Sequence, residues 1–232
     1  MATAHGTSTR CTAEDRRRQI LATATDIFAR QGFKGTTTRQ IAEAAQVNEA
    51  IIFRHFPSKE ELYWAVLEHK CNEGRKRWQR YEHLADGTSP EEAFASLARA
   101  YLQHRRQDAS LGRLLLFSAL EHHQLSRRFF ETYIAKFYED TARGIRKQIQ
   151  AGKFREVDPL LAARSFFGMV WYHFLIQELF GAKYVQKFHL DKASRAIADI
   201  WLQGMLPRGK PPATGGRQLA GAAGAGRKRA KR

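Results

Sequence analysis

The sequence predicts an all-α fold, with a small N-terminal helical unit followed by a larger helical body. Along the central part of the chain, apolar residues recur at spacings of three and four, which is the period of a helix with one buried face. No segment shows the two-residue alternation of a half-buried strand. With 232 residues, 43% of them hydrophobic, the chain is long enough to bury a substantial core.

The first predicted helix ends at Gly32. Glycine is the usual residue after a helix C-terminus, because it adopts positive φ without steric cost. The apolar stripe that would face the core consists of Ile20, Leu21, Ala24, Ile27 and Phe28.

Two short helices are predicted next, crossed through a tight turn. Thr37 and Gln40 have the spacing of a capping box and predict a helix start, and Ile41 supplies apolar surface one residue later. Residues 46–48 separate this helix from another, which Asn48 can cap and which ends before a proline at 57. Two short helices joined by a three-residue turn indicate a helix-turn-helix.

A long helix is predicted from Ser58 to about Leu84, because Ser58 and Glu61 form a second capping box. The turn-forming residues at 86–90 interrupt the helical pattern. Beyond them, helices are predicted at about 90–107, 109–122, 125–151, 158–180 and 188–205.

Half of the formal net charge of +16 lies in residues 206–232, which carry eight Lys or Arg and no Asp or Glu. This segment is rich in Gly, Ala and Pro, has little to bury, and is predicted to be disordered. The composition of this segment is equally compatible with two roles. It is either a solubilising end, or an arm that adds salt-sensitive attraction to nucleic-acid phosphates.

Several function classes are disfavoured by the sequence. No segment is long and apolar enough to span a membrane, and the first ten residues lack a secretory signal, so a cytoplasmic (nucleoid-associated) protein without a membrane partner is expected. Cys11 and Cys71 are interpreted as free thiols. The nine histidines show no metal-ligand spacing, and neither a phosphate loop nor a nucleophile elbow occurs. An enzyme, a metal site and a cofactor are therefore not predicted.

The helix-turn-helix region carries a specific resemblance. Residues 32–45, the pair Val47-Asn48 and residues 52–62 closely resemble the DNA-binding domain of the TetR family of transcriptional regulators, and the match covers about residues 14–70. The resemblance implies a dimeric transcriptional regulator, with a repressor favoured. The corresponding division is a flexible N-terminus (1–13), a DNA-binding domain (14–74), a ligand-binding and dimerisation domain (75–205) and a disordered basic tail (206–232).

Carried over by motif position, the residues implied to contact DNA are Thr38, Arg39, Asn48, Glu49, Ala50, Ile51, Phe53, Arg54, His55 and Lys59. Arg39 can bind guanine O6 and N7 through two hydrogen bonds, and Lys59 lies at a helix N-terminus, where an anion is favoured. For Glu49, the sequence is about equally compatible with a contact to a DNA base and with a carboxylate that is only solvated. The chain departs from the family pattern at Gln46, where the family usually has glycine, and at Ile51, where it usually has a small residue. Gln46 is expected to cost stability if its φ is positive.

For the body, the resemblance implies a homodimer through the last two helices and a small-molecule pocket. The apolar residues predicted for the dimer interface are Phe166, Val170, Phe174, Ile197, Ile200 and Trp201. Those predicted to bind an unknown apolar or aromatic effector are Tyr101, Phe117, His123, Phe130, Tyr133, Phe137, Trp171, Tyr172 and His173. The DNA partner is expected to be a two-fold symmetric operator.

The sequence leaves two alternative functions open. One is a helical protein that binds nucleic acid without sequence preference through its basic tail. The other is an activator with the same fold.

Overall fold

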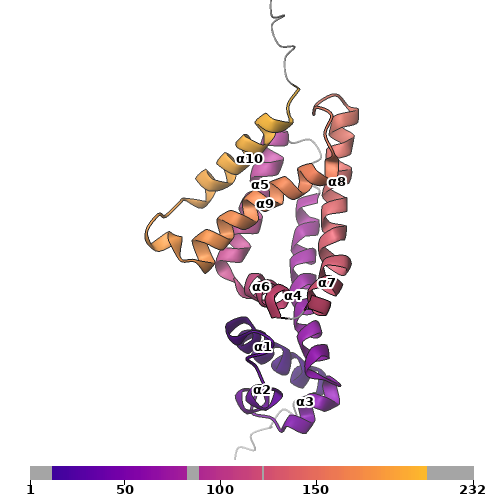
Figure 1. Cartoon of the computed structure of the whole chain (residues 1–232), viewed down its shortest axis with the longest axis vertical. Coiled ribbons are helices and arrows are strands. Elements are labelled where there is room, and N and C mark those ends of the chain that lie inside the picture. Colours follow the sequence, from indigo (N-terminus) through magenta and orange to yellow (C-terminus); the bar gives the residue numbers. More distant parts are fainter. Residues whose placement is uncertain (1–11, 83–88, 122, 208–232) are drawn as a thin grey trace, which may run out of the picture.

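The computed structural model describes residues 12–82, 89–121 and 123–207, and of 75–82 and 123 it describes the backbone alone. All regular secondary structure within these ranges is helical, as the sequence predicts (Figure 1). We call residues 12–74 the head and residues 89–207 the body. Most of the predicted N-terminus (1–13) and basic tail (206–232), and Cys11, lie outside the described residues.

Four helices form the head and its exit: α1 (Ala13–Gln31), α2 (Thr38–Ala44), α3 (Glu49–His55) and α4 (Lys59–Glu82). Capping side chains fix their starts. The Thr12 hydroxyl accepts from the Asp15 N–H (3.1 Å), and the Thr37 hydroxyl accepts from the Gln40 N–H (3.2 Å). The capping box predicted at Thr37 is confirmed.

Gly32 ends α1, as predicted, and it fulfils two requirements at once. Its φ is +75°, a conformation that disfavours other L-residues, and its N–H donates to the Phe28 carbonyl (2.9 Å). In addition, a Cβ at this position would lie only 2.7 Å from the Phe117 ring of the body. The residue therefore shapes both the turn and the approach of the body to the head.

The body contains six α-helices in its described part: α5 (Pro90–Gln107), α6 (Ser110–Glu121), α7 (His123–Phe129), α8 (Ala135–Gln150), α9 (Pro159–Phe174) and α10 (Leu190–Met205). A π-helical turn, η2 (Phe130–Ile134), joins α7 to α8, and another, η3 (Leu175–Leu179), extends α9. A short 3₁₀ turn, η4 (Ala182–Tyr184), precedes α10. The helices predicted at 125–151 and 158–180 thus exist, each with a π-turn that periodicity did not reveal.

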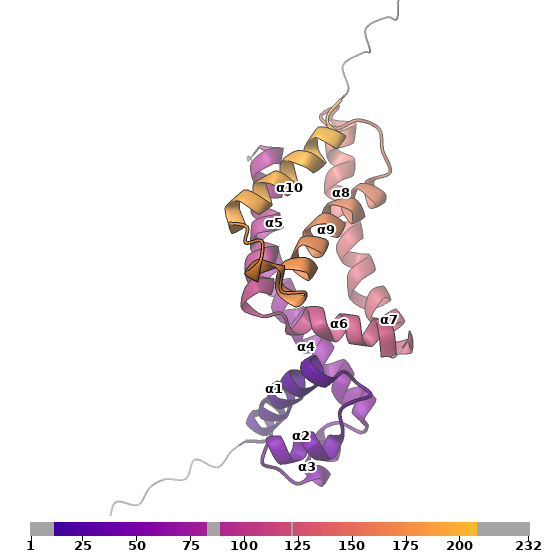
Figure 2. The ribbon, with the colours of Figure 1, turned by 60° about the vertical axis from the view of Figure 1, so that its left-hand side comes forward.

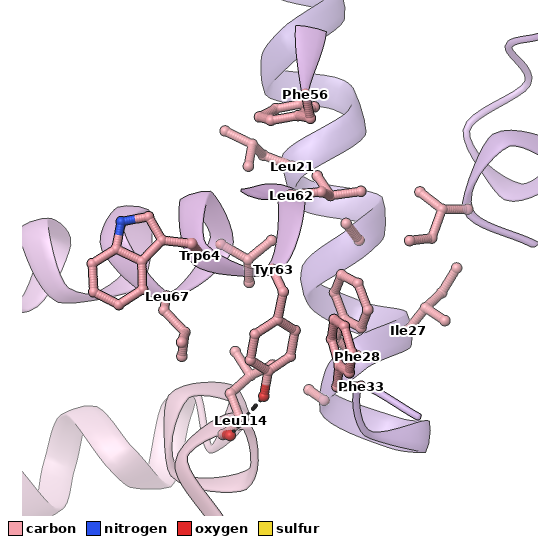
Figure 3. Close-up of a cluster of buried hydrophobic side chains, with 14 of the residues drawn as sticks. Leu21, Ile27, Phe28, Phe33, Phe56, Leu62, Tyr63, Trp64, Leu67 and Leu114 are labelled. Atoms are coloured by element: carbon pink, nitrogen blue, oxygen red, sulfur yellow. Dashed lines mark hydrogen bonds between the residues drawn. The ribbon is translucent and has the colours of Figure 1, made fainter. Parts of the chain in front are cut away.

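The head has a compact aromatic and aliphatic core centred on Tyr63 of α4 (Figure 3). The Tyr63 ring stands edge-on to Phe28 (4.8 Å between centroids) and to Phe33 (5.4 Å). Its buried hydroxyl donates to the Leu114 carbonyl of α6 (2.8 Å), and burial raises the pKa of this phenol well above its usual range. Tyr63 therefore joins the head to the body through a buried hydrogen bond.

Helices α6 and α7 lie between the head and the rest of the body (Figure 2). They bury Leu111, Leu114, Leu125 and Phe129 in the same core cluster as the head residues. Polar contacts add to this packing. Arg113 Nε donates to the Ala29 carbonyl of α1, and the Lys34 N–H donates to the Glu121 carboxylate (2.9 Å). The head core is consequently completed by residues from the body.

A second core cluster fills the body. Helix α10 packs along α5, and α9 crosses between them and α8 (Figure 1). Aromatic rings dominate this core. The centre of the Phe94 ring lies 4.3 Å from that of Trp201 and 5.0 Å from that of Phe166. Trp201 Nε1 donates to the Ala162 carbonyl (3.0 Å), so the one polar atom of this side chain is satisfied. No helix in the described ranges is both long and apolar enough to cross a bilayer.

Candidate nucleic-acid interface and effector site

The α2–turn–α3 unit is built from local hydrogen bonds. Gln46 has φ +52°, and it is the one non-glycine residue with positive φ in the described chain. The departure from glycine noted in the sequence therefore falls on a position that does require a left-handed conformation. After this turn, Asn48 Oδ1 accepts from the Ala50 N–H (2.9 Å) and starts α3, as predicted.

Helix α3 is anchored by one face and presents the other to solvent. Ile52 is fully buried in the head core, and Phe56, just after the helix, is buried as well. On the opposite face, Ala50, Phe53 and Arg54 are exposed. A short helix held this way can enter a groove without disturbing the packing of the head.

The predicted DNA-contacting residues at the start of α2 and α3 come together in space. Thr38 Oγ1 donates to Glu49 Oε1 (2.5 Å), which ties the first turns of the two helices. Arg39 is exposed and forms an ion pair with Glu43 one turn later (3.0 Å). Such an exposed pair contributes little to stability, so the guanidinium can exchange partners at small cost.

Three further positions predicted to contact DNA, Glu49, Ile51 and His55, are half-buried in the head. Ile51 is half-buried and packs against the head core, so much of its surface is already used. His55 is half-buried as well, with its ring 6.4 Å from that of Phe56. The Glu49 carboxylate is engaged by Thr38.

Lys59, which is predicted to hold a phosphate, also has an internal contact. Its ammonium donates to the Thr36 carbonyl (2.7 Å) and lies 4.3 Å from the centre of the Phe33 ring. The reason is the turn after α1, which leaves the carbonyl of the buried Thr36 in need of a donor. A phosphate contact would have to be shared with this internal role.

Sequence reasoning missed Arg17 on α1. Its guanidinium lies 5.0 Å from the centre of the Phe56 ring, so the first turns of α1 lie beside the end of α3. This places an additional positive charge beside Phe56, the residue that directly follows α3. The only signal in the sequence was a run of three arginines at 16–18, which spacing alone does not assign to this surface.

The residues predicted to bind an effector do not line one cavity. Phe117 faces Gly32 of the head, and Tyr133 packs between Phe129 and Trp64. Phe130 and Tyr172 are exposed on the surface. The side chain of His123 lies outside the described residues. Aromatic residues at helical spacing occur here on several different faces, which is why the sequence could not group them.

The remaining members of that set occupy the body interior or its edge. Phe137 packs on Phe167 (4.5 Å between centroids), Trp171 packs on Phe174 (5.2 Å), and Tyr101 packs against the body core. His173 alone lines a cavity of about 370 Å³ between α5, the end of α9 and the segment before α10. Burial lowers the pKa of His173. The lining of this cavity consists of Leu102, Arg106, His173, Phe174, Gln177, Glu178, Lys183, Tyr184, Lys187, Phe188 and Leu190.

The predicted dimer interface also requires correction. Five of its six residues are buried within the chain itself: Phe166, Val170, Phe174, Ile197 and Trp201. The large apolar faces of α9 and α10 are covered by α5 and α8 in a single chain, so they are unavailable to a partner. Only Ile200, 63% exposed, lies on the outside.

Two family models match the chain, one within the head and the other within the body. Residues 20–66 match the model described as bacterial regulatory proteins of the tetR family. Residues 92–203 match the C-terminal domain of AefR-like transcriptional repressors.

Curated relatives are named as transcriptional regulators. Over 50 residues the chain is 48% identical to the HTH-type transcriptional repressor Rv3405c of Mycobacterium tuberculosis, a match that covers 22% of this chain and 27% of that protein. Over 207 residues it is 26% identical to the HTH-type transcriptional regulator RutR of Escherichia coli K12, covering 83% of this chain and 92% of that protein.

Solved structures share the fold. AibR, solved in complex with isovaleryl coenzyme A and operator DNA, superposes with a TM-score of 0.64 at 23% identity, covering 80% of this chain and 97% of the AibR chain. The head and body are thus matched in sequence by two family models, and a solved structure that spans both shares their fold. The chain belongs to the TetR family of bacterial regulatory proteins.

Proposed function

We propose that this protein is a dimeric DNA-binding transcriptional repressor, which a small molecule bound in the body releases from its operator. The observation that carries the proposal is the geometry of α3. Its buried face is locked into the head by Ile52, while Ala50, Phe53 and Arg54 project outward beside the start of α2. This is the arrangement a recognition helix needs to enter the major groove.

Arg39 is the residue we propose for base recognition. Its guanidinium is largely exposed and is held only by the surface pair with Glu43, so it can pair instead with guanine O6 and N7. Arg17 and Arg54 add positive charge around it and suit phosphates. Asn48, Ala50 and Phe53 complete the proposed reading surface, whereas Ile51, His55 and Lys59 support it mainly through packing.

For the dimer, we propose the outer faces of α9 and α10. Leu161 and Tyr172 of α9 are 60% and 62% exposed, and they lie eleven residues apart, which places them on one face of the helix. Ile200 of α10 is exposed to the same degree. Apolar side chains this exposed on long helices suit a two-fold interface. A dimer would present two α3 helices to a two-fold symmetric operator.

The proposed division of labour keeps DNA binding in residues 14–74 and effector binding and dimerisation in 75–205. AibR is described in complex with both an acyl-coenzyme A and operator DNA, which supports the combination of the two activities in this fold. In this chain α6 would couple them, since Glu121 and Arg113 bond directly to head residues. Binding of DNA and binding of an effector would then oppose each other without any catalytic turnover.

The test is selection of bound sequences from a random DNA pool at a stated salt concentration. We expect a two-fold symmetric motif for the wild type, and loss of information at one position of each half-site for Arg39→Ala. Arg143→Ala is the matched control, because the Arg143 side chain is also mostly exposed, at 65%, and forms an ion pair with Asp140 in the body (3.0 Å). Absence of any enriched motif, or equal effects of the two variants, would contradict the proposal.

A chain that ends at Pro207 separates this proposal from binding by the basic tail. We expect it to select the same motif with lower affinity and a shallower salt dependence, because residues 208–232 carry eight basic residues and no acidic ones. Loss of all DNA binding in this variant would favour the tail-driven alternative. A promoter–reporter assay with the selected operator then gives the sign of regulation, which we expect to be repression.

A further inference from the structure

An arginine occupies the core-facing side of α5. Ala98, Leu102 and Arg105 follow one another at spacings of four and three, and all three are buried. Arg105 is only 9% exposed, in a position where the helix pattern calls for an apolar residue. Long charged side chains are almost never buried to this extent unless an opposite charge accompanies them.

No such partner accompanies Arg105 within the described residues. Its Nε is shielded from solvent and has no hydrogen-bond partner, and none of the described carboxylates forms an ion pair with the guanidinium. The nearest acidic residue along the helix, Asp108, is already paired with Lys70 of α4 (2.9 Å). Tyr101 contacts the guanidinium in two ways: its ring centre lies 5.2 Å from the guanidinium carbon, and its hydroxyl oxygen accepts a hydrogen bond from Arg105. These contacts offset only part of the desolvation cost of a buried charge.

The surroundings of Arg105 are aromatic and carry hydroxyl donors. Burial raises the pKa of Tyr101, although the charge of Arg105 and a hydrogen bond from it oppose this effect, and burial likewise raises the pKa of Tyr138. Both phenols therefore stay protonated at neutral pH and can donate hydrogen bonds. The centre of the Phe167 ring lies 6.2 Å from that of Tyr138 and 4.5 Å from that of Phe137. Apolar rings therefore adjoin the tyrosines.

The structure also leaves room on the α4 side. Gly74 lies one turn beyond Lys70, and the Lys70 ammonium bonds Asp108 at the end of α5, so this stretch of α4 faces the last turns of α5. A Cβ at Gly74 would have no heavy atom within 4 Å, so the surface of α4 is open at this residue.

We propose that Arg105 is the anchor for the carboxylate of the effector, and that the effector is a small amphiphilic monoacid whose apolar part lies along the aromatic residues of α8 and α9. This inference rests on the proposed function, since it names the effector class of that regulator. A single guanidinium balances one negative charge and can bind a carboxylate through two parallel hydrogen bonds. Tyr101 would add a hydroxyl donor to the same group.

The test measures ligand binding to the full chain by calorimetry and by the shift in melting temperature. The probes are sodium octanoate and sodium 3-phenylpropionate, each compared with its uncharged methyl ester at constant ionic strength. We expect the wild type to bind the acids and not the esters. Arg105→Met removes the charge at similar side-chain length and should weaken acid binding about tenfold to a hundredfold, the range for a hydrogen bond to a charged group.

The control is Arg106→Met, which changes the neighbouring, exposed arginine on the wall of the 370 Å³ cavity. We expect acid binding to be unchanged in this variant. Arg105→Lys keeps the charge without the planar fork, and should bind the acids more weakly than the wild type even if Arg105→Met fails to fold. Equal binding of esters and acids, an unchanged affinity in both Arg105 variants, a loss in Arg106→Met, or no binding of either acid would each overturn the proposal.

DNA selection in parallel separates this inference from the function on which it rests. If acid binding depends on Arg105 but no DNA motif is enriched, the acid site stands and the proposed regulator function is wrong. If a motif is enriched but neither acid binds, the regulator function stands and the acid site is wrong.

Discussion

The interiors of the head and the body differ in how their buried polar groups are satisfied. In the head, the hydroxyls of Thr25, Thr36 and Tyr63 donate to backbone carbonyls at 2.7–2.8 Å. In the body, buried polar atoms without a hydrogen-bond partner, Arg105 Nε among them, occur on α5, α6 and α8 of the described chain. Unsatisfied buried groups are costly and therefore scarce in native proteins.

This difference matches two tasks. A recognition helix has to be held in one geometry, and full hydrogen bonding with tight packing achieves this. A body that binds a ligand gains from polar groups that only the ligand satisfies, because ligand binding then stabilises one conformation over another. The two regions nevertheless meet in one core, through α6 and α7.

The largest effect is expected from Leu114→Ala. Leu114 belongs to the body in sequence but is fully buried in the head core, and removing its side chain should lower the free energy of unfolding by about 3–5 kcal/mol. Leu120→Ala is the control, because Leu120 lies on the same helix and is 84% exposed. Urea unfolding measures both variants. Similar, small losses in the two would mean that α6 does not complete the head core.

A smaller, pH-dependent effect is expected at the α4–α5 junction. Burial alone would raise the pKa of Asp108, but hydrogen bonds from Ser110 and Lys70 outweigh it and hold the pKa at about 2. Because this is below the value of about 4 in an unfolded chain, the ionised group stabilises the fold above pH ~4, and this contribution disappears as the pH falls toward ~2.

Asp108→Asn should therefore lower stability by about 1–2 kcal/mol at neutral pH, after allowance for partial solvent screening, and by progressively less below pH ~4. Urea titrations across this pH range check it, with Asp191→Asn as the control, because the Asp191 side chain is 65% exposed. A difference from wild type that stays constant with pH would rule out the assigned role.

The smallest effect, and the only stabilising one, is expected from Gln46→Gly in the head. Glycine removes the strain of φ +52°, which outweighs the greater freedom it gives the unfolded chain, for a net gain of about 0.5–1 kcal/mol. The same substitution at Gln103, in the exposed middle of α5, should instead cost about 1 kcal/mol. Thermal unfolding of the two variants should shift in opposite directions.

Local features were predictable from the sequence, whereas the partners of each surface were not. The capping box at Thr37 and the end of α1 at Gly32 depend on a few neighbouring residues, and both are confirmed. The departure from glycine at Gln46 marked a position whose φ the structure shows to be positive. Periodicity shows that α9 and α10 have apolar faces, but not that the same chain covers them. This is why five predicted interface residues are core residues.

Contacts between residues distant in sequence account for the other differences. Lys59 meets a carbonyl 23 positions away, and Glu121 meets the N–H of Lys34 at a separation of 87. No spacing rule links such pairs. The π-turns at 130–134 and 175–179 could not be predicted, because a single extra residue in a helical turn barely changes the spacing of apolar residues.

The contribution of α6 and α7 to the head core bears on how such regulators are recombined, in evolution or by design. A DNA-reading module cut after α4 would leave the surface covered by Leu111, Leu114, Leu125 and Phe129 open to water. Transplanting a new operator specificity onto this body is therefore expected to succeed when the donor segment carries matching α6 and α7 residues. The natural unit of exchange is discontinuous along the chain.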